Sequence, residues 1–208
     1  MAIRAVITGD IVNSTQLATV KEKKLLNVLK NILVPHQFEF YRGDSFQMYQ
    51  RNAGGALKTA LLCRTAAISI SQDNKAATAD VRLSIGIGEV TTASPKNLGT
   101  AKGEAFILSG RAFDDIAKND TRLVIATANP LANEGLQVIA DYINAIFRAM
   151  TGKQATVIFE LLNGQTQQLV AAKMKKSKST ISQHVSSGRW TEIERLLQQY
   201  ENIVKQIS

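Results

Sequence analysis

Two aspartates at the ends of strand-like runs are the residues of this sequence best suited to chemistry. Asp10 follows the run IRAVIT at residues 3–8, and Asp44 lies within FEFYRGDSFQMY at residues 38–49. Alternating apolar and polar residues on either side of Gly43 and Asp44 predict a β-hairpin with those two residues at its tip. If the strands are neighbours in one sheet, the two carboxylates converge at one edge, where they could hold Mg²⁺.

Each aspartate also has a purely structural interpretation. An aspartate at a hairpin tip often only shapes the turn, and an aspartate that precedes a helix often only caps it or faces its dipole. The choice therefore depends on whether the fold brings Asp10 and Asp44 together.

The hydrophobic pattern predicts the sheet and helices that would position them. A helix is expected from a cap at Ser14 or Thr15 to Pro35, and the hairpin follows it. The remaining predicted elements are a helix from residue 54, a strand at 81–88, a helix at 105–118 and a strand at 122–127. This order predicts an α+β fold with helices on one face of an antiparallel sheet. In the strand at 81–88, one face carries Gly86 and Gly88 and so lets a ligand or another backbone approach closely.

Composition narrows the class of protein. The 208 residues carry a formal charge of +8, which suits a polyanionic partner but is also a common solubility feature. The single cysteine, Cys63, lies in an apolar helical pattern, so we expect a buried residue and no disulfide framework. No apolar run approaches ~18 residues, and Asp10 interrupts the N-terminal stretch where a signal peptide would still be hydrophobic. A soluble cytoplasmic protein without a membrane partner is expected.

Four segments in order resemble the core of the class III nucleotide cyclases. They are ITGDIVNST, YRGDSF, RLSIGIGEVTT and GEAFILSGRAF, and within them GDSFQ and SIGIGEV are closer still to the SatD family. The resemblance covers residues 1–127 and implies a ferredoxin-like, nucleotide cyclase-like domain at 1–128. Because the cyclase site is shared between two chains, it also implies a homodimer.

The resemblance implies roles for individual residues. Asp10 and Asp44 would bind Mg²⁺ or Mn²⁺ on a nucleoside triphosphate, with the carbonyl of Ile11 as an extra ligand and Gly43 beside the nucleotide. Arg111, on the helix after the glycine-rich strand, would stabilise charge that develops in the transition state. The alternative for Arg111 is an exposed helix residue whose stem covers the sheet.

Three positions depart from the cyclase pattern. Phe40 stands where cyclases often carry a purine-reading lysine, Ile107 where they carry a ligand-positioning asparagine, and Thr100 where they carry a base-selecting aspartate. A site with metal ligands but without these polar groups either binds a different nucleotide or is no longer catalytically active.

Beyond Asn129-Pro130 the sequence reads as helix throughout, so a second domain is predicted at 129–208. Its residues 166–185 resemble the helix-turn-helix of bacterial regulators. Thr166 would cap the first helix and Ser177 or Ser179 the second, with Lys175 at the usual turn glycine. The helix pair would cross at Ala171, with Met174 and Ile181 filling the space between the helices.

This second domain is predicted to bind double-stranded DNA. The residues offered to base edges or nearby phosphates are Lys178, Ser179, Thr180, Ser182 and Gln183, and those offered to phosphates are Lys173, Lys175, Lys176 and Arg189. The alternative is a helical appendage for dimerisation or docking, with a solvated basic face.

Two functions follow. The leading one is a DNA-binding transcriptional regulator whose N-terminal domain senses a nucleotide or dimerises. The alternative is a Mg²⁺- or Mn²⁺-dependent nucleotidyl cyclase or nucleotidyltransferase that acts on a nucleoside triphosphate.

Overall fold

The computed structural model describes residues 3–41, 43–71, 79–91, 97–116 and 120–208. Its strands are β1 (Arg4–Val12), β2 (Gln37–Tyr41), β3 (Ser45–Gln50), β4 (Asp80–Gly88) and β5 (Leu123–Thr127). Its helices are α1 (Thr19–Leu33), α2 (Ala56–Ser69), α3 (Glu104–Ile116), α4 (Pro130–Arg148), α5 (Gly152–Leu162), α6 (Gln167–Met174), α7 (Lys178–Ser187) and α8 (Trp190–Gln206). The predicted hairpin is confirmed as β2 and β3.

One five-stranded sheet organises the N-terminal part, in the order β2-β3-β1-β4-β5. The central strand β1 is antiparallel to both β3 and β4, whereas β5 is parallel to β4. The sheet is therefore mixed rather than wholly antiparallel as predicted. A parallel pair needs a crossover connection, and α3 supplies it between β4 and β5.

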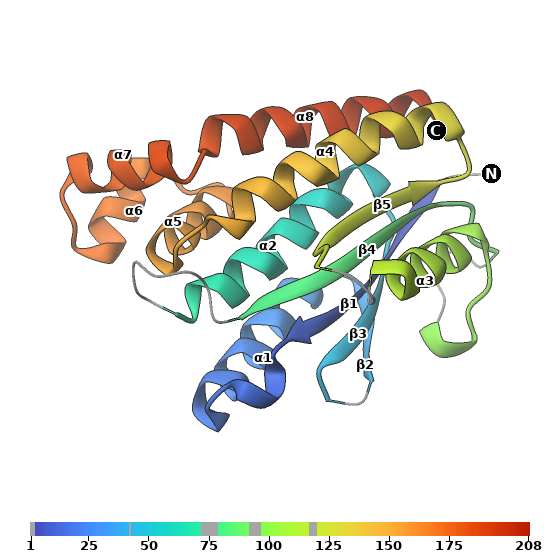
Figure 1. The fold of residues 1–208 in the computed structure, drawn as a ribbon, viewed down its shortest axis with the longest axis horizontal. Helices are drawn as coiled ribbons and strands as arrows, with labels where there is room; N and C mark the ends of the chain where they lie inside the picture. The colour runs from blue at the N-terminus through green and yellow to red at the C-terminus, as the bar shows by residue number, and fades with distance from the viewer. Residues whose placement is uncertain (1–2, 42, 72–78, 92–96, 117–119) are drawn as a thin grey trace.

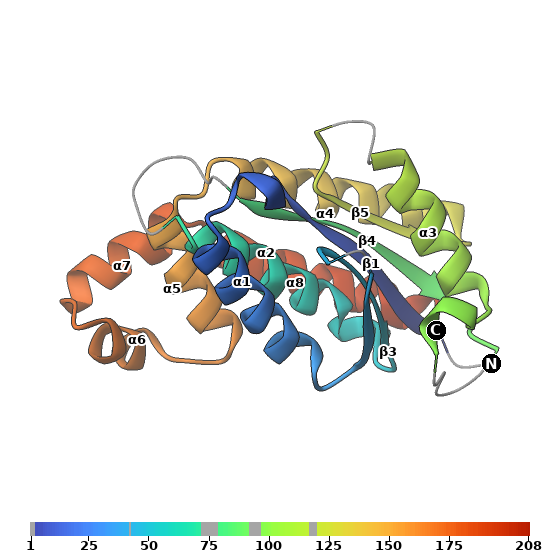
Figure 2. The same ribbon diagram turned by 90° about the horizontal axis from the view of Figure 1, so that it is seen from below.

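Helices cover both faces of the sheet, and the prediction that they lie on one face is wrong. Figures 1 and 2 show α1 and α2 on one side of the sheet and α3 on the other. The reason lies in β4, where Leu83, Ile85 and Ile87 join the core on the α2 side. On the opposite face, a Cβ at Gly86 would lie 2.2 Å from the carbonyl oxygen of Ala105. The bare glycine face thus lets the α3 backbone approach closely.

A continuous hydrophobic core joins the sheet to the C-terminal helices. It extends from Ala5 to Val204, and α2 is buried between the sheet and the later helices. Tyr200 of α8 is fully buried and donates a hydrogen bond to the carbonyl of Ala53 at 2.8 Å. The predicted division at 128/129 falls where the Asn129 side chain caps α4, but the core continues across it. Cys63 is buried in this core, as predicted.

Helices α6 and α7 form a tight helix pair at one end of the molecule (Figure 1). Thr166 caps α6, and Ser177, rather than Ser179, caps α7. Lys175 at the end of α6 has a φ of 52°, a left-handed conformation that usually favours glycine. Ile181 is fully buried in the same core as Ala171. Within the described residues, no helix has both the length and the apolar character needed to cross a lipid bilayer.

Candidate metal site at the hairpin edge

The fold brings the two aspartates together at one edge of the sheet. Asp10 of β1 lies opposite Ser45 of β3, the residue that follows Asp44. The backbone N–H of Ile11 donates to the Asp44 carbonyl at 3.1 Å, which ties the hairpin tip to β1. Gly43 at the tip has a φ of 90°, the positive value that the turn was predicted to need.

The carboxylate of Asp44 is oriented by a residue outside its own hairpin. Its Oδ2 accepts a hydrogen bond of 2.7 Å from the Ser14 hydroxyl, and its Oδ1 lies 3.4 Å from the Ser45 hydroxyl. Ser14 was predicted as a candidate helix cap, but it begins a short 3-10 turn at Ser14–Gln16, and α1 starts only at Thr19. Asn13 makes this turn possible by adopting a φ of 59°.

Asp10 carries an oxygen whose hydrogen-bonding capacity is not met. Its Oδ1 is buried and accepts no hydrogen bond from any residue that the structure describes, and the Nε of Arg82 lies 3.8 Å away, too far for one. Burial raises the pKa of Asp10 and the nearby Asp44 raises it further, while Arg82 and Arg122 act in the opposite direction. A buried carboxylate oxygen beside a second carboxylate favours a bound cation.

Sequence reasoning missed Arg82 and Arg122, which lie beside Asp10. Arg82 is the cross-strand partner of Asp10 in β4, and Arg122 immediately precedes β5, where its carbonyl accepts from the Leu83 N–H at 2.8 Å. Arg82 was visible as a charged residue in the alternating strand at 81–88. Its partner could not be read from the sequence, because that depends on strand register.

A ladder of hydroxyl groups attaches α3 next to this site. The Ser109 hydroxyl lies 2.8 Å from the hydroxyl of Thr8, and the Ser84 hydroxyl donates to the Ser109 carbonyl at 2.7 Å. Gln47 donates to Thr8 at 3.3 Å. These contacts fix where α3 lies on the polar face of β1 and β4.

Of the other predicted ligand residues, Ile11 lies next to Asp10 and is hydrogen-bonded to Asp44, whereas the rest lie on other elements, namely Arg111, Ile107, Thr100 and Phe40. Arg111 and Ile107 are on the exposed side of α3, one turn apart, and Ile107 is 53% exposed. Thr100 is exposed in a short 3-10 turn at Leu98–Thr100. Phe40 packs against the rings of Phe38 and Phe46, which gives it a structural role. The Ile11 side chain is buried in the core.

The residues present fit a cation that is shared with a ligand. Among the described residues, no three His, Cys, Asp or Glu side chains gather as a complete metal cage. Mg²⁺ is usually held by only one or two carboxylates together with substrate phosphates and water. Asp10 and Asp44 supply two carboxylates of this kind.

No protein-family model and no curated protein matches the sequence. Among solved structures, a bacterial light-regulated adenylyl cyclase is similar over 60% of this chain and 75% of its own, with 14% identity and a TM-score of 0.41. The active GGEEF domain of a diguanylate cyclase from Vibrio cholerae is similar over 61% of this chain and 83% of its own, with 14% identity and a TM-score of 0.39. At these values the similarity carries no conclusion about activity. The resemblance to the SatD family and to a helix-turn-helix regulator stays a prediction.

Proposed function

We propose that Asp10 and Asp44 bind a divalent cation together with the phosphates of a nucleotide, as the core of a Mg²⁺- or Mn²⁺-dependent nucleotidyl cyclase or nucleotidyltransferase. The observation that carries the proposal is the buried Oδ1 of Asp10, which has no hydrogen-bond partner among the described residues and lies near a second carboxylate. In such a site the cation would neutralise phosphate charge and lower the barrier to attack by a hydroxyl.

The residues around the pair have distinct roles in this proposal. Ser14 holds Asp44 in one orientation, as a hydrogen bond to a metal ligand commonly does. Arg111 is exposed on α3, so it would stabilise transition-state charge only from a second copy whose α3 faces the aspartates. The homodimer predicted from the cyclase resemblance would provide that arrangement.

The test is incubation of the protein with Mg²⁺ or Mn²⁺ and each nucleoside triphosphate, followed by mass spectrometry of the products. We expect a cyclic or oligomeric nucleotide that disappears in Asp44→Ala. The matched control is Asp114→Ala, which removes an exposed carboxylate from α3. Direct titration with Mn²⁺ separates binding from turnover, and a wild-type protein that neither binds Mn²⁺ nor forms product would exclude the proposal.

DNA binding is the second candidate, and the shape of the α6–α7 pair favours it. Residues on the open side of α7 are exposed, namely Lys178, Ser179, Ser182 and Gln183, and Thr180 is half-buried. Lys175 and Lys176 in the turn are exposed as well. Such a helix could enter a major groove with these side chains toward bases and phosphates.

Two of the predicted phosphate contacts are engaged elsewhere. Lys173 donates to both carboxylate oxygens of Glu160, at 2.7 and 2.9 Å. Arg189 donates to Glu192 and, at 2.6 Å, to the Tyr142 hydroxyl. Electrostatic attraction to DNA would therefore depend mainly on Lys175, Lys176 and Lys178.

The DNA test uses the full chain with a library of duplexes over a range of salt concentrations. Gln183→Ala should relax sequence preference, whereas Lys176→Ala should weaken binding to all duplexes and reduce the salt slope by about 1. Lys205→Ala, which removes an exposed lysine from α8, is the matched control. Absence of salt-sensitive duplex binding by the wild type would remove this candidate.

A further inference from the structure

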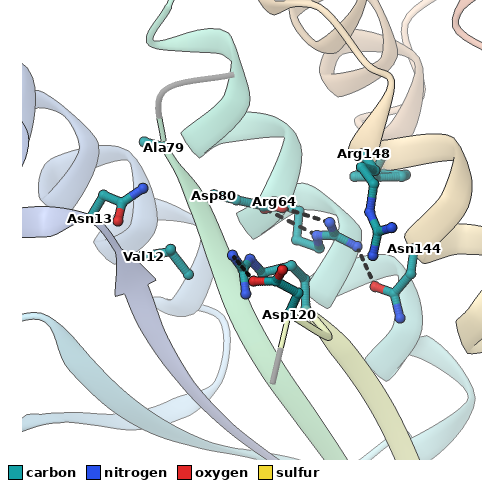
Figure 3. Close-up of a pocket in the computed structure, with 10 residues that line it drawn as sticks. Val12, Asn13, Arg64, Ala79, Asp80, Asp120, Asn144 and Arg148 are labelled. Atoms are coloured by element: carbon teal, nitrogen blue, oxygen red, sulfur yellow. Dashed lines mark hydrogen bonds and ion pairs between the residues drawn. The ribbon is translucent and has the colours of Figure 1, made fainter. Parts of the chain in front are cut away.

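A cavity of about 290 Å³ opens at the same end of the sheet as the two aspartates. The end of β1, the starts of β4 and β5, and the helices α2 and α4 surround it (Figure 3). Three arginines line it: Arg64 from α2, Arg122 immediately before β5, and Arg148 from the end of α4. None of these three arginines was predicted from the sequence as a site residue.

The positive charge of Arg64 is compensated by hydrogen bonds within the protein. Its Nε and Nη2 donate to the two carboxylate oxygens of Asp80 at 3.1 and 2.6 Å, and its Nη1 donates to Asn144 at 3.1 Å. Asp80 also accepts from the Val81 N–H at 2.7 Å. The charge of Asp80 is therefore offset by Arg64, and within the described residues Asp80 forms no ion pair with either of the other two arginines.

Arg122 and Arg148 are only weakly compensated by opposite charges in the described part of the chain. Asp10 lies near Arg122 but forms no ion pair with it. The Nη2 of Arg122 lies 3.7 Å from Asp120, whose side chain is 95% exposed, so this pair is weak. Arg148 makes no hydrogen bond or ion pair within the described part of the chain. In Figure 3 its guanidinium points toward Arg64 and Asn144, so like charges converge on one cavity.

An amide donor adds to this arrangement. Asn13 lines the cavity in a left-handed conformation with a φ of 59°, and its side chain makes no capping hydrogen bond. Asparagine is one of the residues that adopt this conformation most readily, and here it leads into the 3-10 turn at Ser14–Gln16. Its amide, like the two guanidinium groups, can donate to a bound anion.

We propose that this cavity binds a phosphate-type oxyanion, held by Arg122 and Arg148 with Asn13 as a further donor. The planar guanidinium fork matches the oxygens of a phosphoryl group, and its charge makes each hydrogen bond stronger than a neutral one. The volume lies at the small end of ligand pockets, which suits a phosphate or a compact phosphorylated molecule. The fixed Arg64–Asp80 pair forms one wall of the cavity.

The test titrates inorganic phosphate into the full-length protein by calorimetry, without divalent cations and with chloride replacing phosphate at constant ionic strength. We expect saturable binding at one site. Arg148→Gln should weaken it about tenfold or more, since hydrogen bonds between charged groups are stronger than neutral ones. Arg195→Gln makes the same charge change on the exposed surface of α8 and should leave the affinity within about twofold.

A second arm repeats the titration with adenosine monophosphate to distinguish the source of the phosphoryl group. Tighter binding than inorganic phosphate assigns the cavity to a nucleotide, and equal or weaker binding assigns it to free phosphate. Non-saturable binding, or equal losses in Arg148→Gln and Arg195→Gln, would overturn the proposal. Asp44→Ala should bind phosphate normally, so failure of the metal site and failure of this cavity are distinguishable.

Discussion

Arg64 and Asp10 are two charged side chains at the same end of one sheet, and the protein treats them differently. Arg64 is 1% exposed, donates to Asp80 and Asn144 through three nitrogens, and lies 4.6 Å from the centre of the Phe147 ring. Within the part of the chain that the structure describes, Asp10 has a buried oxygen with no hydrogen bond, and the Nε of Arg82 is 3.8 Å from it.

The difference separates a structural charge from a candidate binding charge. Removing a charged group from water costs several kcal/mol unless hydrogen bonds and an opposite charge offset that cost. Around Arg64 the offset is complete within the protein. Around Asp10 it is incomplete, so a cation from solution would supply what is missing.

Replacing Arg64 should give the largest change in stability, because it leaves the charge of Asp80 without its partner. We expect Arg64→Ala to lower the free energy of unfolding by about 3–5 kcal/mol, measured by urea denaturation. The double variant Arg64→Met, Asp80→Leu should recover a substantial part of that loss. A loss below about 1 kcal/mol in the single variant would show that the pair is not structural.

Adding Mn²⁺ should stabilise the folded protein if the ion binds at Asp10 and Asp44. At a concentration 100 times its dissociation constant, a bound ion raises the free energy of unfolding by about 2.7 kcal/mol. Thermal unfolding should show this gain in the wild type and not in Asp44→Ala. An equal gain in both proteins would assign the ion to another site.

Ser14→Ala should loosen the Asp44 carboxylate without removing it. Loss of the 2.7 Å hydrogen bond should weaken Mn²⁺ binding about tenfold, the lower end of the range for groups that orient metal ligands. Calorimetric titration measures the change, and Ser179→Ala on α7 serves as the matched control. Unchanged affinity would mean that Ser14 has no part in the site.

Asp10→Asn should give the smallest change in the free energy of unfolding. The sign of that change shows whether Asp10 is a binding residue or a structural one. Burial first, and then Asp44, raises the folded-state pKa of Asp10, so the ionised carboxylate destabilises the folded protein. The wild type should lose stability as pH rises from the unfolded-state pKa through the raised folded-state pKa.

At pH 7 without metal, we therefore expect Asp10→Asn to gain about 1 kcal/mol in free energy of unfolding and to lose the pH dependence that Asp10 causes. Denaturant titrations from pH 4 to pH 8 measure both. A clear loss of stability would instead identify Asp10 as a structural partner of Arg82.

Local patterns in the sequence predicted the parts of the fold that depend on neighbouring residues. The alternation around Gly43 and Asp44 predicted the hairpin, and side-chain types predicted the caps at Thr166 and Ser177. The side of the sheet that α3 covers was not predicted. A glycine-bearing strand face permits the approach of either a ligand or a helix, and only the assembled sheet shows which one fills it.

The candidate site was predicted only in part, for a related reason. Asp10 and Asp44 could be found because each lies at the end of its own strand pattern. The neighbours Arg82 and Arg122 depend on strand register, and the Ser14 contact depends on a turn conformation at Asn13. An arginine within the apolar run LLCRTAAI was a usable signal for the buried Arg64.

The position of α2 has a consequence for how this protein is made. This helix is buried on nearly all sides. Just before its first residue, the Ala53 carbonyl accepts a hydrogen bond from Tyr200, which lies 147 residues later in the chain. During synthesis α2 leaves the ribosome long before α5 and α8 exist, so its outer surface stays uncovered until α8 has emerged. That interval is when a nascent chain is most prone to aggregate, and chaperone depletion should reduce the yield of this protein more than that of one whose core closes locally.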